Sequence, residues 1–214
     1  MINASALDNG LHAGDLKFVD LDGNNKIEQT TSANDRKDMK VIGNSLPRYN
    51  YNFGISADWY GIDFSVLFQG IGKQNWYPGA ETSMFWGPYS RPYASFIPSD
   101  FMSQVWSEEN TDAYFPRPRG YVALGSNREL AVVNTKYLQN LAYCRLKNLS
   151  IGYTLPDKWL SKIGFEKIRV YFSGENLLTF TKLHSDYIDP EQASASNSWK
   201  TSKSDANIYP WAKT

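Results

Sequence analysis

The 214-residue sequence has little cysteine and no long apolar run, and each scarcity excludes a class of protein. Its single cysteine, Cys144, rules out an internal disulfide framework and a zinc cluster built on thiolates. No stretch approaches the run of about 18 apolar residues that a transmembrane helix needs, and the first residues lack the basic start and apolar core of a signal peptide. A transmembrane strand would escape this test, because its residues alternate in polarity.

Neither sign of charge is in excess, since 22 Lys plus Arg balance 22 Asp plus Glu. A net charge of zero gives no long-range attraction to nucleic acid, so we expect no nucleic-acid partner. Catalytic groups are equally scarce. The sequence has two His, His12 and His184, both in polar segments, and the carboxylates Glu108 and Glu109 resemble a glycosidase pair only in residue type. We therefore expect no enzyme and no catalytic residues.

What the sequence does have is aromatic side chains, with 7 Trp, 14 Tyr and 11 Phe. Four of them take part in a strict alternation over residues 49–59, where apolar positions fall on one side of a strand and polar positions on the other. Alternation over this length exceeds that of most globular strands and suits a bilayer crossing. A tight turn at Tyr60–Gly61 and a second alternating run predict a hairpin over 48–72.

Two more strands are predicted within 137–180. The first ends near Leu155, and a link from Pro156 to Gly164 with helical spacing separates it from the second. Elsewhere the sequence predicts loops, with one short strand over Leu16–Val19 and a brief helix capped by Ser99.

The predicted connections differ greatly in length. Two are short, whereas residues 73–136 form a long aromatic loop, and this asymmetry is typical of outer-membrane barrels. Four strands cannot close such a barrel, which needs about eight, so the barrel interpretation makes the chain a fragment. The alternative is a soluble β-sandwich, which would act as a carbohydrate-binding module with a calcium loop.

Several segments then favour the barrel. They are GDLKFVDLDGNNKI at 14–27, PRYNYNFG at 47–54, YCRLKNLSIGYTLP at 143–156, RVYFSGENLLTFT at 169–181 and DPE at 189–191. In this order they resemble SusC/RagA-type TonB-linked (TonB-dependent) outer-membrane receptors of Bacteroidetes. The resemblance implies an all-β fold, in which antiparallel strands from the C-terminal part of a transmembrane β-barrel do not close on their own and carry long extracellular loops.

The resemblance also assigns a place to each part of the chain, 1–214. Residues 1–47 would be an extracellular loop, 48–72 a hairpin, 73–136 the long aromatic loop, 137–180 two strands, and 181–214 a loop before a last strand that the chain lacks. The residues expected to touch lipid are Ile55, Phe64, Val66, Ile151 and Val170. Those expected to line the lumen are Asn52, Asp63, Gln69, Asn148 and Arg169.

The function implied by the resemblance is uptake of an oligosaccharide or another large nutrient, glycan or peptide, across the outer membrane. The implied partners are a SusD-like surface lipoprotein that acts as a lid, and TonB, which would bind parts of the receptor absent here. Aromatic faces suit sugar rings, so Trp76, Tyr77, Trp86 and Tyr89 are candidate substrate contacts. The alternative is that these aromatics pack the loop or contact the lid.

A calcium site is the remaining candidate. Asp20, Asp22 and Asn24 have the spacing of the front half of an EF-hand loop, and Asn25 tolerates the left-handed backbone of the sixth position. We predict Glu28 and Asp35 as the carboxylates that complete it, with Asp38 also within reach. The alternative is an Asx-rich turn held by its own side-chain hydrogen bonds.

Overall fold

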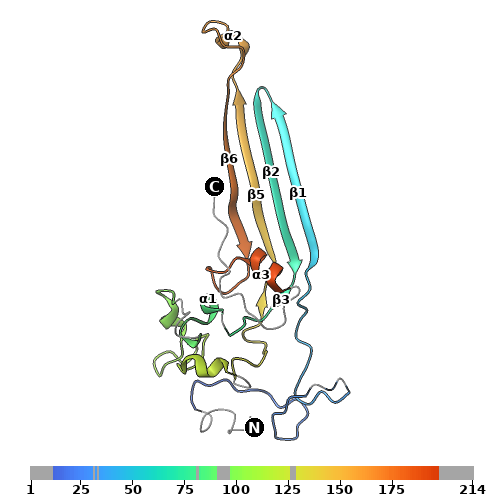
Figure 1. Ribbon diagram of the computed structural model, residues 1–214, viewed down its shortest axis with the longest axis vertical. Helices are drawn as coiled ribbons and strands as arrows, with labels where there is room; N and C mark the ends of the chain where they lie inside the picture. The colour runs from blue at the N-terminus through green and yellow to red at the C-terminus, as the bar shows by residue number, and fades with distance from the viewer. Residues whose placement is uncertain are drawn as a thin grey trace. The chain divides into compact units, whose positions relative to one another are not determined.

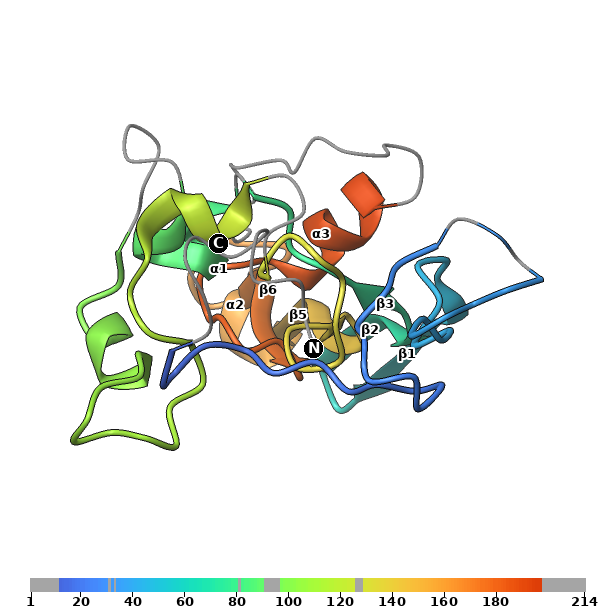
Figure 2. The same ribbon diagram turned by 90° about the horizontal axis from the view of Figure 1, so that it is seen from below.

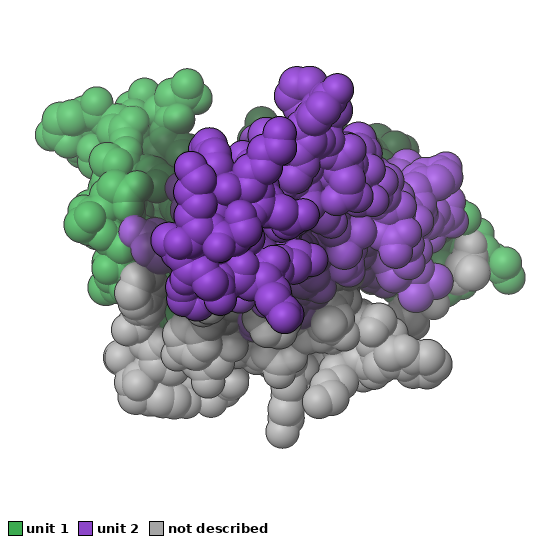
Figure 3. All heavy atoms as spheres, turned by 90° about the horizontal axis from the view of Figure 1, so that it is seen from above, with its two compact units in different colours: residues 1–43, 77–138, 200–208 green, residues 44–76, 139–199, 209–214 purple. Residues whose placement is uncertain are grey.

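The structure is a computed structural model that describes residues 12–30, 32, 34–80, 82–90, 97–125 and 129–197. It divides the chain into two compact units, coloured in Figure 3. Unit 1 comprises Met1–Gly43, Tyr77–Leu138 and Lys200–Ile208, and unit 2 comprises Asn44–Trp76, Gln139–Trp199 and Tyr209–Thr214. The end of the expected last loop, 198–214, lies outside the described residues, as do residues 1–11.

Unit 2 is built on a four-stranded antiparallel sheet in the order β1-β2-β5-β6, whose strands lie side by side in Figure 1. Its strands are β1 (Arg48–Trp59), β2 (Ile62–Lys73), β5 (Tyr143–Thr154) and β6 (Arg169–Thr181). A second, two-stranded sheet pairs β3 (Asn75–Trp76) with β4 (Gln139–Asn140). Short helices follow two of the long strands: α2 (Asp157–Leu160) follows β5, and α3 (Pro190–Asn197) follows β6.

The hairpin of β1 and β2 turns at Tyr60 and Gly61, as the sequence predicts. Both residues have positive φ, 47° and 84°, which is the backbone of a two-residue type I′ turn. The turn places Trp59 opposite Ile62, and the pairing then runs to Arg48 opposite Lys73. A turn of fixed length therefore sets the register of the whole hairpin.

The register gives the sheet one apolar and one polar face. The apolar face carries all five residues expected to touch lipid, and several are widely exposed, such as Ile55 at 61% and Val170 at 64%. The five residues expected to line a lumen lie on the opposite face. Among the described residues, the two-residue strands β3 and β4 form the only other sheet, so the architecture is not that of a β-sandwich.

A bulge in β5 adjusts which side chains reach the polar face. The pairing of β5 with both neighbours shifts near Lys147, so that Arg145 pairs with Gln69 and Asn148 pairs with Leu67. One extra residue therefore leaves both Arg145 and Asn148 on the polar face. The neighbouring strand β6 accommodates the shift with Asn176 at a φ of 53°.

Unit 1 contains α1 (Ser83–Trp86) and the 3₁₀ helices η2 (Gly87–Tyr89), η4 (Phe101–Gln104) and η5 (Gly120–Leu124), joined by irregular chain. The predictions of local structure were partly wrong here. Leu16–Val19 forms no strand, and the expected helix near Ser99 is a 3₁₀ helix that begins after Asp100. Residues 16–19 pair with no strand among the described residues, and η4 lacks a side-chain cap.

The helices of the described residues are all short. None of them has the length and apolarity that crossing a lipid bilayer requires. The link expected after Leu155 does contain a helical turn, α2, which buries Leu160 while Trp159 and Ile163 remain exposed.

Candidate functional site

Two of the four predicted sugar contacts lie in the aromatic core of unit 1. Trp86 is 0% and Tyr89 1% exposed, and their rings pack among other aromatic rings. The Trp86 indole has the Phe85 ring 4.8 Å and the Tyr137 ring 5.2 Å away, and its Nε1–H donates to the Pro78 carbonyl at 3.1 Å. This burial favours the packing role, and contact of either side chain with a sugar stays a prediction.

The other two predicted contacts are only partly more accessible. Trp76 lies in β3 of unit 2 and is 9% exposed, whereas Tyr77 in unit 1 is half-buried. The Tyr77 hydroxyl donates to the Leu130 carbonyl at 2.8 Å and accepts from Asn134 Nδ2 at 2.9 Å. Burial raises the pKa of Tyr77 and of Tyr89 above the ordinary tyrosine value, because the phenolate would lose its hydration.

An acidic cluster forms at the predicted calcium loop. One carboxylate oxygen from each of Asp20, Asp22 and Asp38 lies within 4.8 Å of the others. Backbone amides hold the carboxylates in place: Asp20 accepts from Gly23 at 2.7 Å and from Asn25 at 2.6 Å. Gly23 and Asn25 have φ of 78° and 62°, the left-handed backbone that a tight loop of this kind requires.

The cluster differs from the prediction in its distal carboxylate. Asp38 joins it, whereas Asp35 pairs with Lys37 at 3.3 Å and Glu28 accepts from Asn24 Nδ2 at 3.3 Å. The Glu28 amide, at 2.7 Å, and the Leu21 amide, at 2.6 Å, donate to Asp38 and lower its pKa. The sequence placed Asp38 within reach but could not rank it above Asp35, because both follow the loop and only the fold shows which carboxylate lies beside Asp20 and Asp22.

Lys37 and Asp35 form an ion pair in the same loop. The Asp35 carboxylate raises the pKa of Lys37 through a hydrogen bond and by its charge. The three carboxylate oxygens of Asp20, Asp22 and Asp38 are part of a ligand set for Ca²⁺. The ion takes 6–8 oxygen ligands, which include backbone carbonyls and water. The arrangement therefore fits an oxygen-coordinated divalent cation and also fits the hydrogen-bonded Asx turn.

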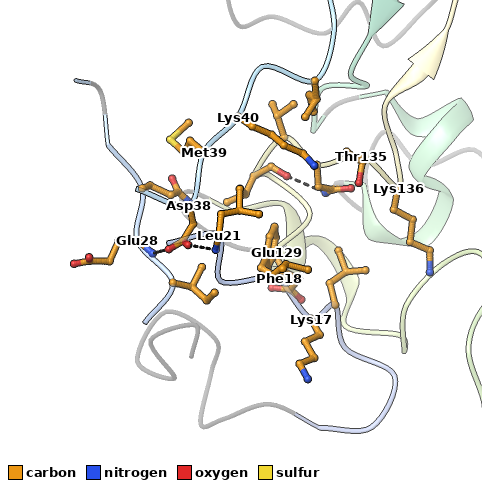
Figure 4. A pocket seen from close by; sticks show the side chains of 18 residues that line it. Lys17, Phe18, Leu21, Glu28, Asp38, Met39, Lys40, Glu129, Thr135 and Lys136 are labelled. Carbon is orange, nitrogen blue, oxygen red and sulfur yellow. Dashed lines mark hydrogen bonds between the residues drawn. The ribbon is translucent and has the colours of Figure 1, made fainter. Parts of the chain in front are cut away.

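A pocket of about 580 Å³ lies beside this loop within unit 1, between residues 16–42 and 129–136 (Figure 4). Its wall is largely apolar and includes Leu16, Phe18, Leu21, Met39 and Val132. Figure 4 shows the Asp38 carboxylate bonded to two backbone amides at one side of the pocket. Sequence reasoning missed the pocket, because its two walls are about a hundred residues apart.

On the polar face of the unit 2 sheet, an ion pair joins β6 to β2 across the strand between them, β5. Arg169 on β6 donates through Nε to Asp63 on β2 at 2.9 Å, and its Nη2 donates to the second carboxylate oxygen. The pair passes directly over Gly152 on β5, where a Cβ would lie 2.5 Å from Asp63 Oδ1 and 2.6 Å from Arg169 Nη2. Glycine at 152 is therefore what lets two non-adjacent strands share a bidentate ion pair.

Known proteins resemble most of the chain. No protein-family model matches it. Curated proteins of Formosa agariphila that match include TonB-dependent receptor P3, which is 34% identical over 176 residues, and TonB-dependent receptor P26, which is 27% identical over 192 residues. These matches cover 81% and 89% of this chain but 15% and 17% of the receptors, so the chain spans less than a fifth of either relative.

Similar solved structures include the RagAB peptide importer in its open-open state, with 23% identity and a TM-score of 0.47 over 77% of this chain and 16% of that one. Another is a structure of the RagAB peptide transporter, with 22% identity and a TM-score of 0.48 over 77% of this chain and 17% of that one.

Proposed function

The chain belongs to the TonB-dependent receptors, and from this we propose that it is part of the barrel wall and outer loops of a SusC-like importer in the outer membrane. The receptor would take up an oligosaccharide or another large nutrient, and its role would be transport and not catalysis. The observation that carries the proposal is the 34% identity to a TonB-dependent receptor over 81% of the chain.

The two faces of the sheet support a place in a membrane barrel. Side chains such as Ile55 and Phe172 are 61% and 58% exposed on the apolar face, where water would be a poor neighbour and lipid a good one. The polar face carries the ion pair of Asp63 and Arg169, which suits a hydrated lumen. In the described part of the chain β1 and β6 are the edge strands of the sheet, and their outer edges would pair with neighbouring strands of the complete receptor.

The test of this proposal uses the whole receptor that contains the chain. We expect it in the outer-membrane fraction, co-purifying with a SusD-like lipoprotein, and we expect its deletion to abolish growth on one class of glycan or peptide. Growth should return with the intact gene and not with a version lacking the TonB-contacting segment. Recovery of the receptor from the soluble fraction would contradict the proposal.

We also propose that the loop over residues 20–38 binds Ca²⁺. The three facing carboxylates of Asp20, Asp22 and Asp38 support it, since affinity in such loops rises with the number of charged ligands. In calorimetric titrations of the receptor, Asp38→Asn should weaken Ca²⁺ binding by roughly tenfold or more. The matched control is Asp35→Asn, which should leave the affinity within about twofold because Asp35 faces Lys37.

The two variants also distinguish a calcium site from an Asx turn that binds no ion. Equal weakening by both substitutions, or no Ca²⁺ binding by the unaltered receptor, would contradict the calcium proposal and leave the hydrogen-bonded turn as the role of these side chains.

A further inference from the structure

Arg145 is the most deeply buried charged side chain on the polar face of the unit 2 sheet, with its side chain 2% exposed. Its guanidinium uses three different nitrogens. Nη2 donates to Asp189, Nη1 donates to Glu191 Oε2 at 2.7 Å, and Nε donates to Thr179 Oγ1 at 3.0 Å. Thr179 lies on the neighbouring strand β6, whereas the two carboxylates come from the segment that follows β6.

Asp189 uses its two carboxylate oxygens for two different elements. Oδ2 pairs with Arg145, while Oδ1 accepts the backbone amides of Glu191 at 2.9 Å and Gln192 at 3.1 Å at the start of α3. These are amides that a helix cannot satisfy internally. One buried carboxylate therefore joins the sheet to the cap of the helix.

The segment around Asp189 also packs by its apolar side chains. Leu183, Ile188 and Ala193 are buried, with exposed fractions of 9%, 3% and 0%. The His184 amide donates to Gln139 Oε1 at 3.2 Å, which ties the segment to β4 as well. Figures 1 and 2 show α3 beside the end of the sheet where β6 finishes and β5 begins.

Three ion pairs make up this network: Arg145 with Asp189, Arg145 with Glu191, and Lys147 with Glu191. The first and the last differ most in environment. Arg145 and Asp189 are buried, at 2% and 3%, whereas Lys147 and Glu191 are 25% and 23% exposed with Nζ 3.0 Å from Oε2. Removing one partner of a buried pair leaves an uncompensated charge, which destabilises far more than the loss of an exposed pair. We therefore expect the loss of the Arg145 charge to loosen the segment after β6 far more than the loss of the Lys147 charge.

We propose that Arg145 is a positioning residue that fixes residues 182–193 as an inward fold against the polar face of the barrel wall. Resting on the proposed import function, this fold narrows the solute path at the end of the sheet where β5 begins. The segment is then a fixed part of the lumen wall, in contrast to a loop that moves freely outside the barrel.

Hydrogen exchange of the whole receptor, read by mass spectrometry, tests the anchor. We expect Arg145→Gln to raise exchange in residues 183–193 about a hundredfold or more. Asp189→Asn should act similarly, because asparagine still caps the helix but no longer pairs as a charge. Arg145→Lys should restore part of the protection, since lysine keeps the charge but not the three-way geometry.

The matched control is Lys147→Gln, which removes the partly exposed pair with Glu191 and should raise exchange less than about fivefold. Peptides from the β1–β2 hairpin report whether the barrel has folded, and they should not change. If Asp189→Asn and Lys147→Gln have equal effects, or if Arg145→Gln leaves residues 183–193 as protected as before, the anchor is refuted. Exchange is measured without solute, so a failure of the import proposal leaves this result readable.

Discussion

Replacing Trp86 by alanine should open the whole aromatic core of unit 1. The indole is 0% exposed and touches the rings of Phe85, Phe115, Tyr77 and Tyr137, with centroids between 4.8 and 6.2 Å away. Substitution would leave a cavity in the middle of this group. It would also remove the hydrogen bond from Nε1 to the Pro78 carbonyl.

The magnitude follows from these contacts. A buried Trp→Ala change costs about 3–5 kcal/mol, and a carbonyl left without its donor adds roughly 1 kcal/mol. At about 1.4 kcal/mol per factor of ten, the opening equilibrium of unit 1 should rise roughly a thousandfold to ten-thousandfold. Trp86→Phe keeps a ring but loses the N–H donor and some volume, so we expect less than half of this free-energy change.

Segment-resolved hydrogen exchange of the receptor measures the effect, with peptides from 77–90 and 97–125 as reporters. Met102→Ala is the control, because Met102 belongs to the same unit but is 59% exposed, so its loss should change stability by less than about 0.5 kcal/mol. Faster exchange confined to unit 1 is the expected result.

Two outcomes would refute the reasoning. Unchanged exchange in Trp86→Ala would mean that the aromatics do not hold the loop. Unchanged exchange together with a lost affinity for a sugar would restore the alternative, in which Trp86 serves as a stacking surface for solute.

Three further predictions concern other parts of the chain. Gly152→Ala should break the pair of Asp63 and Arg169, whose side chains are 29% and 37% exposed, and lower the urea midpoint of the receptor slightly. In an Arg169→Gln background this loss should vanish, and an equal loss in both backgrounds would contradict the account. Backbone amides lower the pKa of Asp38, so their hydrogen bonds stabilise the folded loop fully above the ordinary carboxyl pKa and lose this effect as the pH falls through the lowered pKa. Amide hydrogen exchange in residues 20–38, corrected for intrinsic rates, should therefore rise in acid. A flat pH profile would contradict this prediction. Burial raises the pKa of Tyr89, so the stability linked to its neutral phenol is complete below the ordinary tyrosine pKa of about 10 and is lost as the pH rises through the raised pKa. In the folded receptor near pH 10, Tyr89→Phe should therefore remove no phenolate absorbance. Loss of the phenolate absorbance of one tyrosine would contradict the prediction.

The strands were predictable from sequence because their signal is local. Alternation with a period of two identified β1 and β2 and the faces on which Ile55 and Asp63 lie. The third predicted strand begins later than expected, since 139–140 form the separate strand β4 and β5 starts at Tyr143. The alternation of residues could not predict the separation of β4 from β5, because β4 is a separate strand only through its pairing with β3.

The helix α3 was missed, although Asp189 and Pro190 are a recognisable helix start. Its remaining residues are small or polar, so no apolar face marks it. The position of α3 is set by Arg145, which lies 44 residues earlier than Asp189, and such a contact leaves no local pattern. Burial was likewise hidden from the sequence: Trp86 is 0% and Trp59 is 69% exposed, although both are tryptophans in aromatic segments.

The two-residue turn at Tyr60 and Gly61 has a consequence for how this region can change in evolution. One residue inserted there would slip the hairpin by one position and exchange the two faces of a whole strand. Ile55 would then point toward the polar side, and Asn52 toward the apolar one. Insertions in the long segments 12–43 and 77–138 carry no such penalty, so diversity among relatives should accumulate there while the turn keeps its length.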